Sequence, residues 1–175
     1  MPDDQVIRTA RLDLVLFTLE RLDAVLSDST SIDGVALSTD WLRQYGPWLR
    51  RRRDQIAHDP QHAPWILRAM VRRSPREFVG SIGFHGKPGS NALGAPDAVE
   101  LGYSVEPKFR RQGLAEEAIR GMMDWARARS IFRFIVSVSP SNPASLALAA
   151  KLGFSEVTRV VDEEDGPEIV LELRK

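Results

Sequence analysis

The sequence predicts a single α/β domain over residues 1–175, with strands and helices in the order βαα-βββ-α-β-α-ββ. Two patterns predict it: apolar runs of strand length, and four segments whose apolar residues recur at helical spacing. The composition agrees with this fold class, because 43% hydrophobic and 27% charged residues are ordinary values for a globular chain of 175 residues.

The first third of the chain predicts one strand and two helices. Residues 12–17 alternate between apolar and polar side chains and then continue apolar, which is typical of a strand. Thr18 can cap a helix over residues 19–26, because its hydroxyl can accept a main-chain N–H at the helix start. A second helix is expected over residues 39–58, with a break or kink at Gly46-Pro47, since proline disfavours helix at the residue before it.

The rest of the chain predicts six strands and two helices. One helix is expected over residues 114–129, and another from Asn142-Pro143 to Gly153, because proline suits the first helical position and glycine the turn after a helix. Glycines and prolines predict a loop over residues 85–97. Strands are expected over residues 65–71, 77–84, 98–105, 134–138, 155–161 and 168–173.

The segment that leads into the helix over residues 114–129 has a composition typical of phosphate binding. Small residues let a ligand approach the main chain where the helix presents its N–H groups, and that end carries partial positive charge. Two arginines add full charges and paired donors. We therefore predict a pyrophosphate-binding segment, called the cradle, that consists of Arg110, Arg111, Gln112, Gly113, Leu114 and Ala115. Neither the P-loop pattern nor the dinucleotide Gly-x-Gly-x-x-Gly pattern occurs there.

The bulk composition argues against several classes of function. Basic and acidic residues number 24 each, so no whole-molecule attraction to nucleic acid or to a membrane is implied. The absence of cysteine excludes disulfides and a cysteine acyl-enzyme. Residues 1–5 lack the features of a signal peptide, and we expect a cytoplasmic protein. We expect no metal site from His58, His62 and His85.

Three segments together resemble the GNAT N-acetyltransferase superfamily. Arg110-x-x-Gly113-x-Ala115 is similar to the acetyl-CoA signature of that family, Gln/Arg-x-x-Gly-x-Gly/Ala. The strand from Glu100 to Val105 precedes it, and Asn142-Pro143-Ala144-Ser145 through Lys151-Leu152-Gly153-Phe154 follows it, as in the family. The opening Thr9-Ala10-Arg11-Leu12 is similar to the ribosomal-protein serine/alanine N-terminal acetyltransferases. The resemblance extends from about Leu12 to the end of the chain.

This resemblance implies a mixed, mostly antiparallel sheet that is flanked by helices and splayed between its fourth and fifth strands. Acetyl-CoA, the co-substrate, would lie where those strands separate, with its pyrophosphate in the cradle. Further contacts with acetyl-CoA are implied for the main chain of Tyr103, Ser104 and Val105 and for Asn142.

The resemblance also implies groups that transfer protons. Glu100 is the candidate general base, because an alkyl amine with a pKa near ~10 arrives protonated and must lose a proton. Its alternative interpretation is a strand glutamate that faces solvent. The tyrosine that serves as general acid in many relatives falls at Ala149, so Ser145 is the remaining hydrogen-bond donor to the departing thiolate. The alternative role of Ser145 is helix capping.

The acceptor side of the site is less defined by the sequence. Trp41 and Tyr45 are candidates for lining an acceptor groove, as the early helices do in relatives, and packing in the core is their alternative. The acidic turn over residues 162–165 could attract a cationic amine. The run from Arg50 to Arg53 is interpreted as solvated surface.

The leading hypothesis is an acetyl-CoA-dependent N-acetyltransferase that acts on a primary amine by direct transfer in a ternary complex. The acceptor could be a small molecule or a peptide, and likeness to the subfamily favours a protein or peptide N-terminus. One alternative is a catalytically idle module that binds acyl-CoA. Nucleic-acid binding through the arginines ranks third, no membrane partner is expected, and a homodimer is left open.

Overall fold

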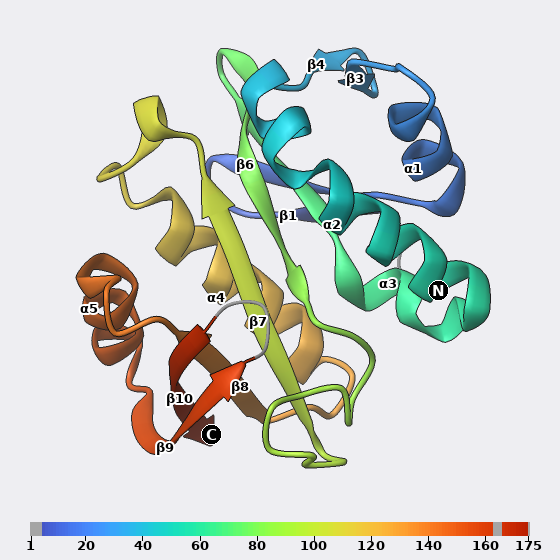
Figure 1. Cartoon of the computed structure of the whole chain (residues 1–175). Coiled ribbons are helices and arrows are strands. Elements are labelled where there is room, and N and C mark those ends of the chain that lie inside the picture. The colour runs from blue at the N-terminus through green and yellow to red at the C-terminus, as the bar shows by residue number, and fades with distance from the viewer. Residues whose placement is uncertain (1–4, 163–165, 175) are drawn as a thin grey trace. The chain divides into compact units, whose positions relative to one another are not determined.

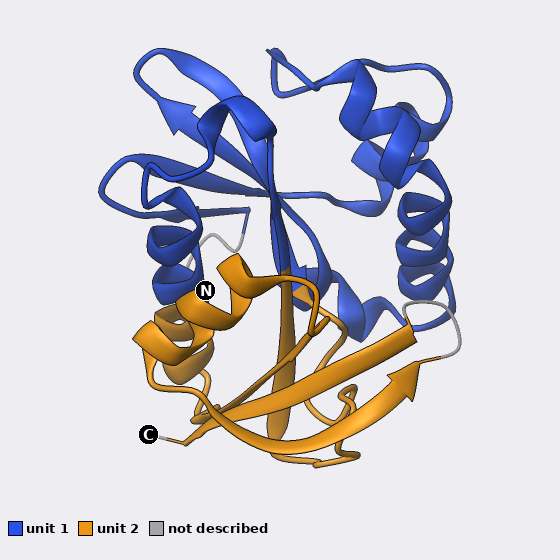
Figure 2. Cartoon of the chain, turned by 60° about the vertical axis from the view of Figure 1, so that its left-hand side comes forward, with its two compact units in different colours: residues 1–83, 103–122 blue, residues 84–102, 123–175 orange. Residues whose placement is uncertain are grey.

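The computed structural model describes residues 5–162 and 166–174, which divide into the two compact units shown in Figure 2. Unit 1 comprises residues 1–83 and 103–122, and unit 2 comprises residues 84–102 and 123–175. Three elements begin in one unit and end in the other: β6 (Arg76–Phe84), β7 (Ala98–Val105) and α4 (Leu114–Arg127). A single domain over the whole chain stays a prediction.

Unit 1 contains an antiparallel run of strands. The order is β1 (Val6–Arg8), β2 (Leu12–Leu16), β5 (Arg68–Arg73) and β6, and each strand pairs with the next one (Figure 1). All five residues of β2 are buried. The core therefore takes up both its apolar residues and Asp13, whose carboxylate is paired with Arg73 and Arg76.

Two helices of unit 1 match the predicted segments. Thr18 caps α1 (Leu19–Leu26) by accepting the main-chain N–H of Arg21, as the sequence predicts. The helix α2 (Thr39–His58) contains Pro47 and continues past it, so the predicted break is wrong, and the kink, given as its alternative, stays a prediction. Its side chains Trp41, Leu49 and Ile56 are buried in one hydrophobic cluster. We attribute the continuity of α2 to this packing, which compensates for the hydrogen bond that proline removes.

Several short elements of unit 1 are absent from the sequence prediction. They are β1, the hairpin of β3 (Ser31–Ile32) and β4 (Val35–Ala36), and the helical turns η1 (Pro60–His62) and α3 (Ala63–Ile66). The start of the predicted strand over residues 65–71 is therefore wrong. A signal for the hairpin existed, because Asp33 and Gly34 adopt φ values of 47° and 75° in the two-residue Asp-Gly turn that hairpins favour.

Unit 2 is built around β8 (Arg133–Val138). On one side β8 pairs antiparallel with β10 (Gly166–Arg174), which in turn pairs antiparallel with β9 (Ser155–Asp162). On the other side it pairs parallel with β7, from Ala98 opposite Arg133 to Glu100 opposite Ile135. This pairing covers the first three residues of β7.

The helix α5 (Pro143–Leu152) completes unit 2 and has both predicted ends. Asn142 caps its start, and Gly153 ends it in the left-handed conformation at φ 94°. The predicted loop over residues 85–97 contains no helix or strand. It is ordered by Asn91, whose side chain bonds to the main chain of Leu93, Ala95 and Ala98. Residues 163–165 of the acidic turn lie outside the described residues.

Candidate functional site

The cradle in unit 1 consists of the loop between the turn η2 (Pro107–Phe109) and α4, together with the first two residues of α4. Arg110, Arg111, Gln112 and Gly113 are exposed, and Leu114 is buried at 2% exposure, where it anchors the helix start. Arg111 and Gly113 have positive φ values of 62° and 75°. Left-handed residues can take part in main-chain turns whose N–H groups bind anions. This conformation and the charges of Arg110 and Arg111 are compatible with the predicted contact with a pyrophosphate, which stays a prediction.

The β1–β2 turn grips α4 close to the cradle. One oxygen of Glu117, Oε1, accepts the main-chain N–H of Arg11 at 2.6 Å and the hydroxyl of Thr9 at 2.5 Å. Its other oxygen accepts Nε of Arg11 at 2.7 Å. The Arg11 guanidinium also donates to the carbonyl of Gln112, at 3.0 Å, inside the cradle. We call these contacts the Arg11–Glu117 clamp, and they tie the cradle to the start of the chain.

The clamp also sets the ionisation of Glu117. Burial alone would raise the pKa of this carboxyl group, but the hydrogen bonds from Thr9 and Arg11, together with the Arg11 charge, lower its pKa below the ordinary 4.5. The carboxylate is therefore the form that the folded chain stabilises.

The end of β7 that the sequence assigns to acetyl-CoA lies partly buried in unit 1. The hydroxyl of Ser104 lies 3.0 Å from the hydroxyl of Ser81 and accepts the indole N–H of Trp41 at 3.3 Å. The carbonyl of Val105 accepts Nε of Arg110 at 3.0 Å. Side chains of neighbouring elements thus hold this end of the strand in place. Tyr103, Ser104 and Val105 are all of intermediate exposure.

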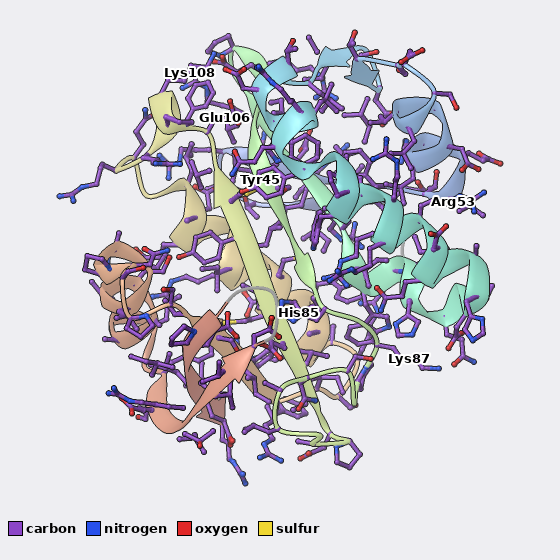
Figure 3. The ribbon with its side chains drawn as sticks, viewed as in Figure 1. Tyr45, Arg53, His85, Lys87, Glu106 and Lys108 are labelled. Atoms are coloured by element: carbon purple, nitrogen blue, oxygen red, sulfur yellow. The ribbon has the colours of Figure 1, made fainter. Side chains whose placement is uncertain are left out.

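The two aromatic candidates for the acceptor groove have different positions. Trp41 is 1% exposed, and its ring packs 5.0 Å from that of Phe78 and 5.5 Å from that of Tyr45. The alternative interpretation, a core side chain, therefore describes Trp41, which has almost no surface to offer an acceptor. Tyr45 lies about one turn further along α2 and is half-buried (Figure 3), so it stays a candidate.

Glu100 is a buried residue of unit 2, at 2% exposure, so the interpretation as a solvent-facing glutamate is wrong. Its Oε1 accepts the Ser137 hydroxyl at 2.5 Å, and its Oε2 accepts the Ala92 N–H at 2.6 Å. His85 places Nδ1 3.6 Å from Oε1, and its main-chain N–H donates to the Glu100 carbonyl at 2.7 Å. These four residues, which come from two strands and a loop, are called the Glu100 cluster.

Asn142 and Ser145 lie together at the start of α5. The Asn142 side chain accepts the main-chain N–H of Ser145 at 3.1 Å, so the capping interpretation holds for Asn142 and for the Ser145 main chain. Ala149, where the family tyrosine would fall, is buried at 5% exposure. The described part of this helix therefore offers a serine near its start and no hydroxyl at the tyrosine position.

The arginine run on α2 is only partly solvated. Arg52 is 8% exposed, which contradicts the prediction for this member of the run. Its guanidinium lies 4.9 Å from the Trp48 ring and donates to Gln55. Arg53 pairs with Asp23 at 2.8 Å. Contacts within unit 1 therefore engage part of the charge that a nucleic acid would need.

Four contributors to these sites were missed by the sequence reasoning. Arg11 was used only to identify a family, and Glu117 only as part of a polar helix face. Ser137 belongs to no motif in the sequence, and His85 was considered only as a metal ligand. Among the described residues, no group of three or more His, Asp or Glu side chains could hold a metal ion. The same residues include no helix that is both long and apolar enough for a membrane span.

Comparison with known sequences supports acetyl transfer. The family model of the acetyltransferase (GNAT) domain matches residues 11–155. The N-acetyltransferase YjdG of Bacillus subtilis is 31% identical over 91 residues, which cover 51% of this chain and 49% of YjdG. The [ribosomal protein bS18]-alanine N-acetyltransferase of Escherichia coli is 32% identical over 62 residues, or 35% of this chain and 42% of that enzyme. The chain thus spans about half the length, or less, of these curated relatives.

Solved structures show the same fold. A Vibrio cholerae protein assigned as a ribosomal-protein-serine acetyltransferase superposes with a TM-score of 0.69 over 100% of both chains, at 19% identity. A ribosomal L7/L12 α-N-protein acetyltransferase in complex with coenzyme A gives 0.63 over 97% of each chain, at 17% identity. The fold is therefore the α/β GNAT fold, with a mostly antiparallel sheet and flanking helices. Because the family model also covers most of the sequence, this chain belongs to the GNAT acetyltransferase family.

Proposed function

We propose that this protein transfers an acetyl group from acetyl-CoA to a primary amine, directly, while both substrates are bound. The observation that carries the donor part is the cradle, an exposed loop with two arginines and left-handed residues at positions 111 and 113. The unpaired N–H groups at a helix start, next to two arginines, suit a doubly charged anion such as pyrophosphate. Membership of the GNAT family supports acetyl-CoA as its source.

The remaining donor contacts extend from the cradle along the pantetheine. We assign the pyrophosphate to the N–H groups from Gln112 to Ala115 and to the charges of Arg110 and Arg111. The main chain of Tyr103, Ser104 and Val105 would pair with the pantetheine amides, and the exposed Asn142 would make a further contact. The hydrogen bonds that fix Ser104 and Val105 support this, because a strand that is already ordered loses little conformational entropy when a ligand binds to it.

The chemistry needs a proton to leave the amine and a proton to reach the sulfur. The amine nitrogen attacks the thioester carbonyl, the C–N bond forms, and the C–S bond breaks with its electron pair on sulfur. We assign removal of the amine proton to the Glu100 cluster. Ser145 is proposed to donate a hydrogen bond to the departing thiolate. Since the chain has no cysteine, transfer without a cysteine acyl-enzyme follows.

For the acceptor we propose the N-terminus of a protein or peptide, with Tyr45 in contact with it. The relative from Escherichia coli, which is named for an alanine of a ribosomal protein, supports this choice. A small-molecule amine is the second candidate.

The test is an acceptor screen that follows thiol release and mass. The chain contains no cysteine, so a thiol reagent reports only coenzyme A. We expect peptides with a free N-terminal serine or alanine to gain one acetyl group while thiol appears, and polyamines to react more slowly. Acetyl-CoA binding without thiol release in the presence of any amine would indicate the idle module instead.

Ser145 is tested in the same assay. Ser145→Ala should lower kcat by about two- to ten-fold, because a hydroxyl is a weak acid and supplies one hydrogen bond. Ser141→Ala, on an exposed serine just before the helix, is the matched control. Unchanged turnover in Ser145→Ala would remove this serine from the mechanism.

A further inference from the structure

We infer that His85 takes the proton from the attacking amine, and that Glu100 is a positioning residue that orients the His85 imidazole. This inference rests on the proposed function and names the group that performs its proton-transfer step.

Burial prevents Glu100 from reaching an amine itself. A general base must approach the donor nitrogen to about 2.6–3.2 Å, directly or through one water. The Glu100 side chain is only 3% exposed. Both of its oxygens already accept short hydrogen bonds, from Ser137 and from the main chain of Ala92. Each oxygen keeps a further lone pair, but a side chain with 3% exposure leaves no room for an amine beside it.

His85 has the exposure that Glu100 lacks. Its side chain is 43% exposed, and it follows the last residue of β6 directly (Figure 3). The main-chain bond from His85 to the Glu100 carbonyl fixes the two residues side by side. The 3.6 Å between Nδ1 and Oε1 is an ion-pair separation, about 0.7 Å beyond the usual N–H···O distance. A small rotation of the ring therefore completes the hydrogen bond.

The pairing selects the tautomer that a base requires. An ionised carboxylate only accepts, so the neutral imidazole places its proton on Nδ1, toward Glu100, and leaves a lone pair on Nε2. Nε2 lies above Gly102, where an added Cβ would be 3.2 Å away. Gly102 directly precedes Tyr103, the start of the segment assigned to acetyl-CoA. Glu100, from β7, lies beside the ring, and Lys87 follows His85 by two residues in the same loop (Figure 3).

The proton-transfer step balances with these groups. As the amine nitrogen bonds to the carbonyl carbon, its proton passes to Nε2 of His85, and the imidazolium is stabilised by the Glu100 carboxylate. The C–S bond breaks, and the sulfur takes up a proton from solvent. The imidazolium returns its proton to solvent, so the products are the amide and the free thiol.

The first experiment compares His85→Gln with His58→Gln, a change of an exposed histidine on α2. We expect His85→Gln to lower kcat/KM by about 10²–10⁴-fold, the usual worth of a general base, with acetyl-CoA affinity unchanged. The wild-type kcat/KM should rise with pH as the His85 imidazole loses its proton and becomes a base, and the variant should lose this rise. A variant as active as His58→Gln would overturn the inference and leave the proposed function intact.

Two further variants keep the inference testable if His85→Gln folds poorly. Gly102→Ala should press a methyl group against Nε2 and lower kcat by about ten-fold. This loss is smaller than the ~10²-fold loss of rate expected when a reacting group is displaced by about 1 Å. Glu100→Gln should lower kcat and leave the acceptor KM unchanged. Equal kcat in wild type and Gly102→Ala would contradict the placement of Nε2.

A spectroscopic measurement separates this inference from the acetylation proposal. The chain has three histidines, so ¹⁵N NMR with each Gln variant assigns the His85 signals. Above neutral pH the wild type should show the Nδ1–H tautomer, and Glu100→Gln should show a mixture. A mixture in the wild type would overturn the positioning role even if the protein acetylates amines. Absence of thiol release in the wild type would instead reject the proposed function, whatever the tautomer.

Discussion

The cradle and the Glu100 cluster are built by opposite means. The cradle uses the main chain of six consecutive residues, of which the first four are exposed, and the Arg11–Glu117 clamp holds it from outside. The Glu100 cluster uses side chains and two main-chain N–H groups from residues 85, 92, 100 and 137, which meet around Glu100, a residue of 2% exposure. A main-chain site can therefore be recognised in a short motif, whereas a side-chain site depends on how distant segments pack.

The largest expected effect tests whether the cradle works by main-chain geometry and charge. Gly113→Asp should weaken acetyl-CoA binding by at least about 100-fold, because like charges about 4 Å apart repel by up to ~4 kcal/mol near a protein surface. Gly113→Asn has the same shape and backbone strain without the charge, so calorimetry should show a much smaller loss for it. Equal affinities for the two variants would mean that no phosphate lies at this loop.

The next effect tests whether the hydrogen bonds of the Glu100 cluster stabilise the folded protein. Glu100→Ala leaves the Ser137 hydroxyl and the Ala92 N–H without their acceptor, so urea denaturation should show a loss of about 2–3 kcal/mol. Glu20→Ala, on the exposed first turn of α1, should cost about 0.5 kcal/mol or less. A loss for Glu100→Ala no larger than that of the control would show that the cluster does not stabilise the fold.

A smaller effect tests the clamp through pH. The pKa of Glu117 is lowered in the folded chain, so its stabilisation is present above the unfolded value of 4.5 and is lost as pH falls through the lower folded value. Glu117→Gln should therefore cost about 1–2 kcal/mol at pH 7, with the difference from wild type shrinking below about pH 4.5. Denaturation at pH 7 and pH 3.5 measures it. A difference that is independent of pH would assign the loss to packing.

Much of the fold was predictable because its signals are local. The bounds of β7 and the caps of α1 and α5 depend on residues that touch in sequence, and the structure confirms them. The predicted break at Pro47 fails because packing of distant residues against α2 outweighs a local preference. The turn α3 replaces the start of a predicted strand, since Pro64 begins a helical turn there.

The candidate site was predictable in part, for the same reason. The sequence indicates Glu100 as a candidate site residue, but its burial and its hydrogen-bond partners depend on the β7–β8 register and on the loop over residues 85–97. His85 has no motif, because its relation to Glu100 arises from a main-chain bond across 15 residues. Trp41 was assigned to a surface groove because helical spacing does not distinguish a groove from a core.

The left-handed conformation of Arg111 has a consequence for how the chain balances stability against ligand binding. A residue with a side chain costs roughly 1–2 kcal/mol at such a φ, and glycine relaxes there. Arg111→Gly should therefore raise the melting temperature while it weakens acetyl-CoA binding, because it removes strain and a positive charge together. The arginine at this position makes the loop less stable than a glycine would. In return, its positive charge is held in place before acetyl-CoA binds.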